Sequence, residues 1–290
     1  MSTGREDQKF ERHRESKPHK WKDSKLLIHL TSDVVAGLGT SLLVAPFVSV
    51  IDKAITSNAS GRQNMTNTLL VGFSNMVKNP INFLTRPSFL AVFAVFSGTY
   101  VTNNAVESVC HHYHTSAVKP KFVLGSAVNV GLNLYKDMLF TKWYATVRPK
   151  PLPRASYLLF ALRDTLTVST AFVLPPLVSP YLQEEPFRLS KSAANFVTQL
   201  TLPCLVQIVS VPVHLVSLDL YNNPEHTTKD RIKLIRAGYW STAFGRVLRT
   251  IPGFGVGGVV NKWAKHEVNI YLKEKAKEFN NPFSSNMSTI

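Results

Sequence analysis

Cysteine is scarce in this sequence, with two residues among 290, Cys110 and Cys204. Both lie in or beside apolar stretches, and two such residues form neither a disulfide framework nor a set of metal ligands. We therefore expect both to be inert packing residues. No cofactor is predicted.

The signatures of common catalytic sites are also missing. The chain contains no Gly-x-Ser-x-Gly, no Walker-type phosphate loop and no His-Glu-x-x-His. His111, His112 and His114 lie close together, but no second group of cysteines or histidines completes a metal site, so a solvated turn is expected there. The sequence predicts a protein that is not an enzyme.

Charge is missing from several long stretches, among them residues 34–51 and 87–105. Runs of roughly 18 or more mainly apolar residues can cross a bilayer core about 30 Å thick. The mean hydropathy of the whole chain is still zero, because the charged residues gather in the tails and connecting segments. Weakly apolar spans of this kind are expected where one helix face lines water.

Basic residues exceed acidic ones by 33 to 18, which gives a net charge of +15. The chain contains no recognisable nucleic-acid module, so no nucleic-acid partner is expected. In a membrane protein this excess favours contact with anionic lipid, such as cardiolipin, or with an anionic solute.

Six apolar runs follow one another in three pairs separated by polar segments. They cover residues 34–51, 88–106, 122–134, 157–182, 193–218 and 241–260. Pro46 and Pro212 lie late in the first and fifth runs, and Arg86, Arg163 and Arg249 mark the starts of the even-numbered runs. A repeat of this length suits a tandem helical hairpin. The predicted fold is an all-α membrane protein with six transmembrane helices, arranged as three tandem helical-hairpin repeats around a central cavity.

The predicted domain organisation has three parts. Residues 1–32 read as a disordered, mixed-charge extension without the apolar run of a secretory signal. Residues 33–272 form the six-helix domain, with repeats at about 33–110, 122–182 and 192–272. Residues 273–290 form a charged C-terminal tail.

This layout resembles the mitochondrial carrier family over about residues 33–272. In that family the odd-numbered helices end in Pro-x-Asp/Glu-x-x-Lys/Arg-x-Lys/Arg, where the proline kinks the helix and the charges form salt bridges that close one side of the cavity. No copy of the motif is complete here, so the resemblance implies a divergent member. The parts that remain, with the kink and gate roles the resemblance implies, are Pro46, Lys53, Asp137, Lys142, Pro212 and Asp219.

Four charged residues lie inside the predicted spans: Arg163, Asp164, Arg246 and Arg249. Charge within a bilayer is costly and usually faces the bundle interior or a water-filled cavity. We therefore predict an anion-binding cavity in which the arginines hold phosphate or carboxylate. In the alternative interpretation, these residues form structural ion pairs or extend towards lipid headgroups.

Two details refine this set of candidate substrate-binding residues. The segment from Arg246 to Lys265 is similar to the last helix of an adenine-nucleotide-type carrier, which implies that Arg249 faces substrate. Arg86 is a further candidate, but its place beside Pro87 at the start of a helix favours a structural role.

Two functions remain open. In the first, a divergent carrier-like protein moves an anionic metabolite through a basic cavity in a mitochondrial membrane. In the second, a protein of the same fold no longer transports and acts as an insertase or scaffold with mitochondrial membrane proteins as partners. We favour the first, in a multi-pass protein of the inner rather than the outer mitochondrial membrane.

Overall fold

The computed structural model describes residues 4–172 and 174–280, and this part of the chain is helical and contains no strand. For residues 4–25, 172, 176, 254, 255 and 276–280 only the backbone is described. The elements are α1 (Gly4–Ala59), α2 (Met65–Lys78), α3 (Pro80–Leu84), α4 (Pro87–His112), α5 (Val118–Tyr144), α6 (Arg154–Phe172), α7 (Leu174–Gln183), α8 (Lys191–Asn222), α9 (Thr228–Thr250), the π-helix η1 (Ile251–Val256) and α10 (Gly257–Asn280).

Several helices begin where the sequence supplies a capping or starting residue. Pro87 is the first residue of α4, where a missing N–H costs nothing. Ser190 caps α8 by accepting a hydrogen bond from the backbone N–H of Ala193. Thr227 and Asp230 form a capping box at the start of α9, and the hydrogen bonds from Thr227 hold the pKa of the Asp230 carboxyl below its usual value.

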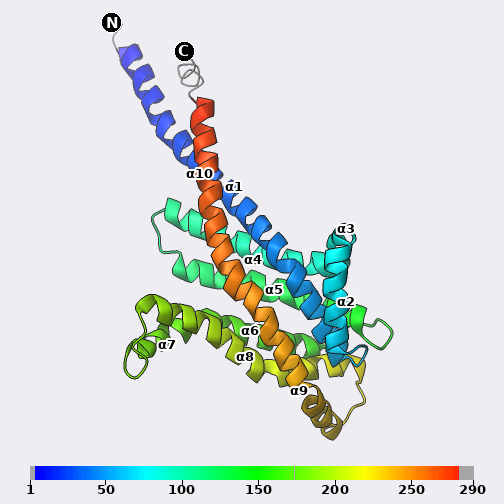
Figure 1. The fold of residues 1–290 in the computed structure, drawn as a ribbon. Helices are drawn as coiled ribbons and strands as arrows, with labels where there is room; N and C mark the ends of the chain where they lie inside the picture. Colours follow the sequence, from blue (N-terminus) through cyan, green and yellow to red (C-terminus); the bar gives the residue numbers. More distant parts are fainter. Residues whose placement is uncertain (1–3, 173, 281–290) are drawn as a thin grey trace.

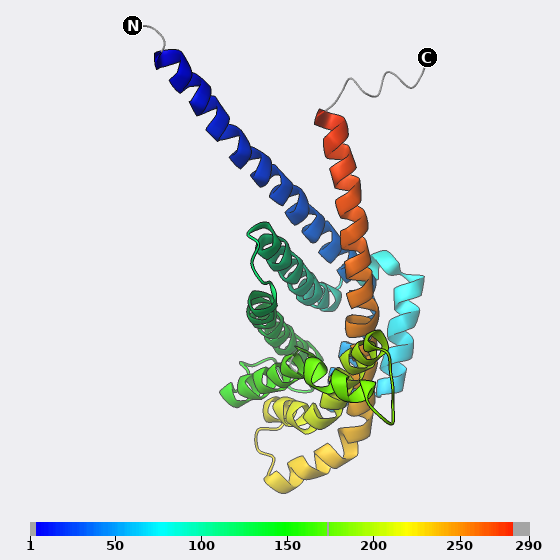
Figure 2. The same cartoon turned by 90° about the vertical axis from the view of Figure 1, so that its left-hand side faces the viewer.

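The helices form a closed ring. Contacts run from α1 to α4, then to α5, α6 and α8, and return through α9 and α10 to α1. Figure 1 shows α4, α5, α6 and α8 stacked one beside the next, while α1 and the continuous segment α9–η1–α10 cross them. In both views α1 and α10 project beyond the other helices on the same side, and the two termini lie there (Figures 1 and 2). The ring therefore has a side with the two termini and an opposite side.

The outside of the ring is more apolar than the surface of a water-soluble bundle. Leucines of α1 and α8 such as Leu43 and Leu205 are exposed on the outside, whereas arginine, lysine and aspartate side chains are buried inside. Apolar surface outside and polar groups within the ring are what a bilayer demands of helices that line a polar cavity. The arrangement supports a membrane protein.

Among the described residues, three helical segments are long and apolar enough to cross a membrane. They are Leu26–Ala59 in α1, Pro87–His112 in α4 and Lys191–Asn222 in α8. The prediction of six spans is therefore confirmed only in part. The run 157–182 lies in α6 and α7, which flank residue 173 outside the described part of the chain. The run 241–260 extends across α9, η1 and α10, and α5 carries several charged residues besides its short apolar run.

The disordered extension over residues 1–32 stays a prediction, and the structure describes α1 as one helix from Gly4 to Ala59. The charged residues of this extension include many glutamates, lysines and arginines, which favour helix by intrinsic propensity. At the other end α10 continues to Asn280, and the rest of the predicted tail lies outside the described residues. The division into three repeats stays a prediction.

Candidate functional site

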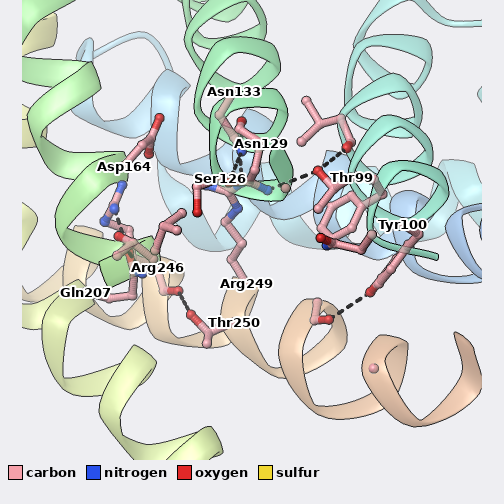
Figure 3. Close-up of a pocket in the computed structure, with 18 residues that line it drawn as sticks. Thr99, Tyr100, Ser126, Asn129, Asn133, Asp164, Gln207, Arg246, Arg249 and Thr250 are labelled. Atoms are coloured by element: carbon pink, nitrogen blue, oxygen red, sulfur yellow. Dashed lines mark hydrogen bonds between the residues drawn. The ribbon is translucent and has the colours of Figure 1, made fainter. Parts of the chain in front are cut away.

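A cavity of about 210 Å³ lies inside the ring, and we call it the inner chamber (Figure 3). Its polar lining comes from five helices: Thr99, Tyr100 and Asn103 of α4, Ser126, Asn129 and Asn133 of α5, Asp164 and Thr167 of α6, Gln207 of α8, and Arg246, Arg249 and Thr250 of α9. Residues distant in sequence therefore meet around one enclosed space. Amides, hydroxyls and charged groups together can hold a small polar solute there.

A larger cavity of about 1050 Å³ adjoins the inner chamber, and we call it the vestibule. Tyr100, Asn103 and Gly258 line both cavities. The vestibule extends between α1 and α10, towards their projecting ends. Its charged and titratable lining is mostly basic: His29, His111, His112, His114, His266, Lys121, Lys262, Lys265 and Lys273, with Glu107. The predicted solvated histidine turn thus lies at the mouth of the route to the inner chamber.

Away from the vestibule, a buried ion cluster closes the inner chamber. We use this name for Asp52, Lys136, Asp137, Arg163, Asp164 and Arg249. The Lys136 Nζ lies 2.7 Å from Asp52 and 2.8 Å from Asp137, and Arg249 Nε lies 3.1 Å from Asp52. Arg163 pairs with both Asp137 and Asp164. Three bases face three acids, so the cluster is balanced in charge.

Neighbouring polar groups extend this cluster in two directions. Arg163 Nη1 donates to Nδ1 of His214 on α8, at 2.8 Å. Arg249 donates to Asn133 at 3.0 Å, Asn133 donates to Asn129, and Asn129 donates to Thr99 at 3.1 Å. A chain of amides therefore connects the charged end of the inner chamber to the end that faces the vestibule.

Arg246 stands apart from this balance. Its guanidinium is buried and donates to two neutral groups, Gln207 Oε1 at 2.5 Å and Ser210 Oγ at 3.4 Å. Among the described residues it has no carboxylate partner, and its Nε has no hydrogen-bond acceptor. A buried cation without a counter-charge is strongly disfavoured. The inner chamber therefore offers an unmet site for an anionic group.

Other lining residues also have buried polar atoms without partners in the described part of the chain. They are Asp164 Oδ2, Asn103 Oδ1 and Ser126 Oγ. An unpaired buried polar atom costs free energy unless a ligand or water completes it. These atoms point to a ligand that carries both a positive group and neutral hydrogen-bonding groups.

The boundary between the two cavities is built by α4 against η1 and α10. The Tyr100 hydroxyl donates to the Gly253 carbonyl at 2.9 Å, within the π-helix that begins beside Pro252 (Figure 3). A Cβ at position 257 would come within 2.1 Å of this hydroxyl, so a side chain there would have to displace Tyr100. π-Helices are rare and frequently occur at functional sites.

Four of the five predicted substrate-binding residues come together here. Arg246, Arg249 and Asp164 line the inner chamber, and Arg163 lies behind them in the buried ion cluster. Arg86 is not among the residues that line the chamber, because it is the N-cap of α4 at the other end of that helix. Substrate binding by the four residues stays a prediction.

The kink and gate residues are more dispersed. Of the four charged ones, Asp137 belongs to the buried ion cluster, whereas Lys53 lies over the Tyr144 ring and Lys142 is half-buried near the end of α5. Asp219 pairs with His226 and Arg231 instead of with the cluster. Neither proline ends its helix: α1 continues through Pro46 and α8 through Pro212.

Several residues of the site were not predicted from the sequence. Asp52 and Lys136 make the central ion pair, each one residue away from a predicted gate residue. Both are charged and lie at the end of, or just after, an apolar run, which is a signal that could have found them. Three further lining residues carry no charge, so their positions inside apolar runs gave little indication that they face a polar cavity: Asn129, Asn133 and Gln207.

The family model that matches residues 36–269 is described as a probable citrulline exporter. No curated protein and no solved structure matches the chain. The resemblance to the mitochondrial carrier family was therefore wrong. The features that carried it, late prolines and arginines within apolar runs, suit many helix bundles that line a polar cavity, and the specific motif was incomplete. The description favours a transporter over an enzyme and does not support the insertase or scaffold alternative. The chain belongs to the probable citrulline exporter family.

Proposed function

We propose that this protein transports citrulline, or a close structural analogue, across a membrane by way of the inner chamber. The observation that carries the proposal is Arg246, a buried guanidinium with only neutral partners in the described structure, at the wall of an enclosed chamber. The family description supports the same class of solute.

The charge of the chamber decides which end of the substrate Arg246 holds. The buried ion cluster contains three acids and three bases, so Arg246 adds one uncompensated positive charge. A carboxylate beside Arg246 gives this guanidinium a local counter-charge and accepts a charge-assisted hydrogen bond from Arg246 Nε. The substrate carboxylate therefore binds at Arg246, with Arg249 beside it.

The amino group of the substrate has a matching partner. Asp164 uses Oδ1 to accept from Arg163 and leaves Oδ2 without a partner among the described residues. An ammonium group beside Oδ2 would donate the hydrogen bond that this oxygen lacks. The sequence led us to expect an anionic metabolite; the pair of Asp164 and Arg246 instead favours a zwitterion that carries both charges.

The route through the protein follows from the two cavities. The vestibule leads to the inner chamber past Tyr100, and the buried ion cluster lies beyond it. Further contacts join the ends of α1, α5 and α8: Arg62 donates to the Trp143 carbonyl at 2.7 Å, and Asn222 donates to Ser60 at 3.3 Å. Transport requires these contacts to separate on the side away from the termini.

Uptake by purified protein in liposomes tests the proposal. Citrulline-loaded proteoliposomes should exchange labelled citrulline, and Arg246→Gln should lower transport efficiency about 100-fold, because a buried charge partner is worth about 2–5 kcal/mol. Arg86→Gln is the matched control, since it makes the same change outside the chamber. Absence of citrulline exchange by the wild type, or equal activity of the two variants, would contradict the proposal.

The membrane in which the protein acts stays a prediction. The inner mitochondrial membrane was implied by the carrier resemblance, which the family match overturns, whereas contact with anionic lipid such as cardiolipin rests on the net charge of +15. Protease protection of a tagged chain, with the outer mitochondrial membrane intact and then ruptured, tests the location directly. Cleavage only after rupture supports the inner membrane.

A further inference from the structure

We propose that Asn103 and Ser126 form a separate subsite, at the vestibule end of the inner chamber, that selects an uncharged hydrogen-bonding side-chain group and rejects a cationic one. The inference rests on the proposed function, because it assigns the other end of the same substrate. It predicts that the protein discriminates citrulline from arginine, its cationic isostere.

Asn103 of α4 packs against Gly125 of α5, the residue before Ser126. Gly125 allows this contact, since a Cβ at this position would come within 2.1 Å of Asn103 Oδ1. In the described structure Asn103 Oδ1 and Ser126 Oγ are buried and have no hydrogen-bond partner. A ureido group satisfies both atoms: its N–H donates to Asn103 Oδ1, and its carbonyl accepts from the Ser126 hydroxyl.

The distance between the two ends of the chamber fits such a substrate. Asn133, which accepts from Arg249, lies seven residues after Ser126 on α5. At 1.5 Å of rise per residue, the charged end and the amide end are about 10 Å apart along the helix. Citrulline in an extended conformation, roughly eight bonds of about 1.5 Å from carboxylate to ureido oxygen, spans this separation.

The charge around the subsite opposes a cation. Asp164 is the only carboxylate among the described residues that line the inner chamber, and it lies at the charged end. Glu107 lies in the vestibule, where it already pairs with Lys121 and Lys265. A guanidinium beside Asn103 would lose its water without gaining a counter-charge. Citrulline carries the same shape without that cost.

Variants that place a carboxylate in the subsite test the inference, because they should change the preference between citrulline and arginine. Competition between labelled citrulline and unlabelled arginine in proteoliposomes gives the preference of the wild type for citrulline. Asn103→Asp changes the amide to a carboxylate of the same shape and should shift this preference towards arginine by at least about tenfold. Ser126→Asp should shift it in the same direction. Asn82→Asp, on an exposed residue of α3, is the matched control and should leave the preference unchanged.

A second measurement covers variants that bind without transporting. In detergent, arginine should raise the unfolding temperature of Asn103→Asp more than that of the wild type, and citrulline should do the reverse. If the wild type exchanges citrulline but neither aspartate variant changes its preference or its thermal response, the subsite is overturned. If the wild type exchanges no citrulline, the proposed function itself fails, so the two failures are distinguishable.

Discussion

Two charged regions of this protein, the buried ion cluster and the vestibule, use the same residue types in opposite ways. In the cluster, Lys136 is 2% exposed and lies between Asp52 and Asp137, which are themselves almost fully buried. In the vestibule, Lys121 and Glu107 pair with 32% and 50% of their side chains exposed. One region is balanced in charge and closed, whereas the other is open and mainly basic.

This difference indicates what each region contributes. A buried ion pair is expensive to form and more expensive to break, so it favours a defined closed arrangement. An exposed pair contributes little to stability and is screened by salt, but a basic surface still attracts the carboxylate end of an approaching solute. The buried ion cluster therefore stabilises the closed state, and the vestibule influences how a solute enters the chamber. Three lysine-to-glutamine substitutions test this contrast.

Lys136→Gln should have the largest effect. It leaves Asp52 and Asp137 buried with one fewer counter-charge, and breaking a buried pair costs about 3–5 kcal/mol. We expect a large fall in the unfolding temperature in detergent and a low yield of folded protein. The double variant Lys136→Gln, Asp52→Asn removes the pair on both sides and should recover part of the loss. A single variant as stable as the wild type would show that the cluster does not hold the closed arrangement.

The residues of this cluster show what could be predicted from the sequence. Charge inside an apolar run is costly, and that single rule was enough to identify Arg163, Asp164, Arg246 and Arg249 as inward-facing candidates. The rule says that such a side chain points inwards, but it does not say which partner it meets. Asp52 and Lys136 lie 84 residues apart, and no local pattern pairs them.

The sequence predicted the fold to about the same extent as it predicted the site. The apolar character of the six runs indicated helices, and the described residues of these runs are helical. The form of each helix was harder to predict, because the run 241–260 passes through a π-helix that contains Pro252. Local breaks of this kind depend on which neighbours satisfy the freed backbone groups, as Tyr100 does for the Gly253 carbonyl.

Lys265→Gln should lower the unfolding temperature by an intermediate amount, because the exposure of the Lys265–Asp33 pair lies between that of the buried Lys136–Asp52 pair and that of the solvated Lys121–Glu107 pair. Lys265 is 20% exposed, but its partner Asp33, 2.9 Å away, is fully buried. The substitution leaves a buried carboxylate without its cation, but Lys265 is itself partly solvated, so the cost should fall below the about 3–5 kcal/mol of a pair that is buried on both sides. Thermal unfolding should show a loss clearly smaller than that of Lys136→Gln. A loss as large as that of Lys136→Gln would mean that the two regions hold the protein together equally, and the contrast would fail.

Lys121→Gln should have the smallest effect, about 0–1 kcal/mol, because both members of its pair with Glu107 are solvated. The dependence of this stability loss on ionic strength is the informative measurement. Any loss of stability at low salt should disappear near 1 M salt, where the Debye length is about 3 Å, whereas the loss in Lys136→Gln should persist. Unfolding temperatures of both variants measured across a salt series would check this. A salt-independent loss in Lys121→Gln would show that the vestibule pair is structural, and the division between a closing region and an access region would no longer hold.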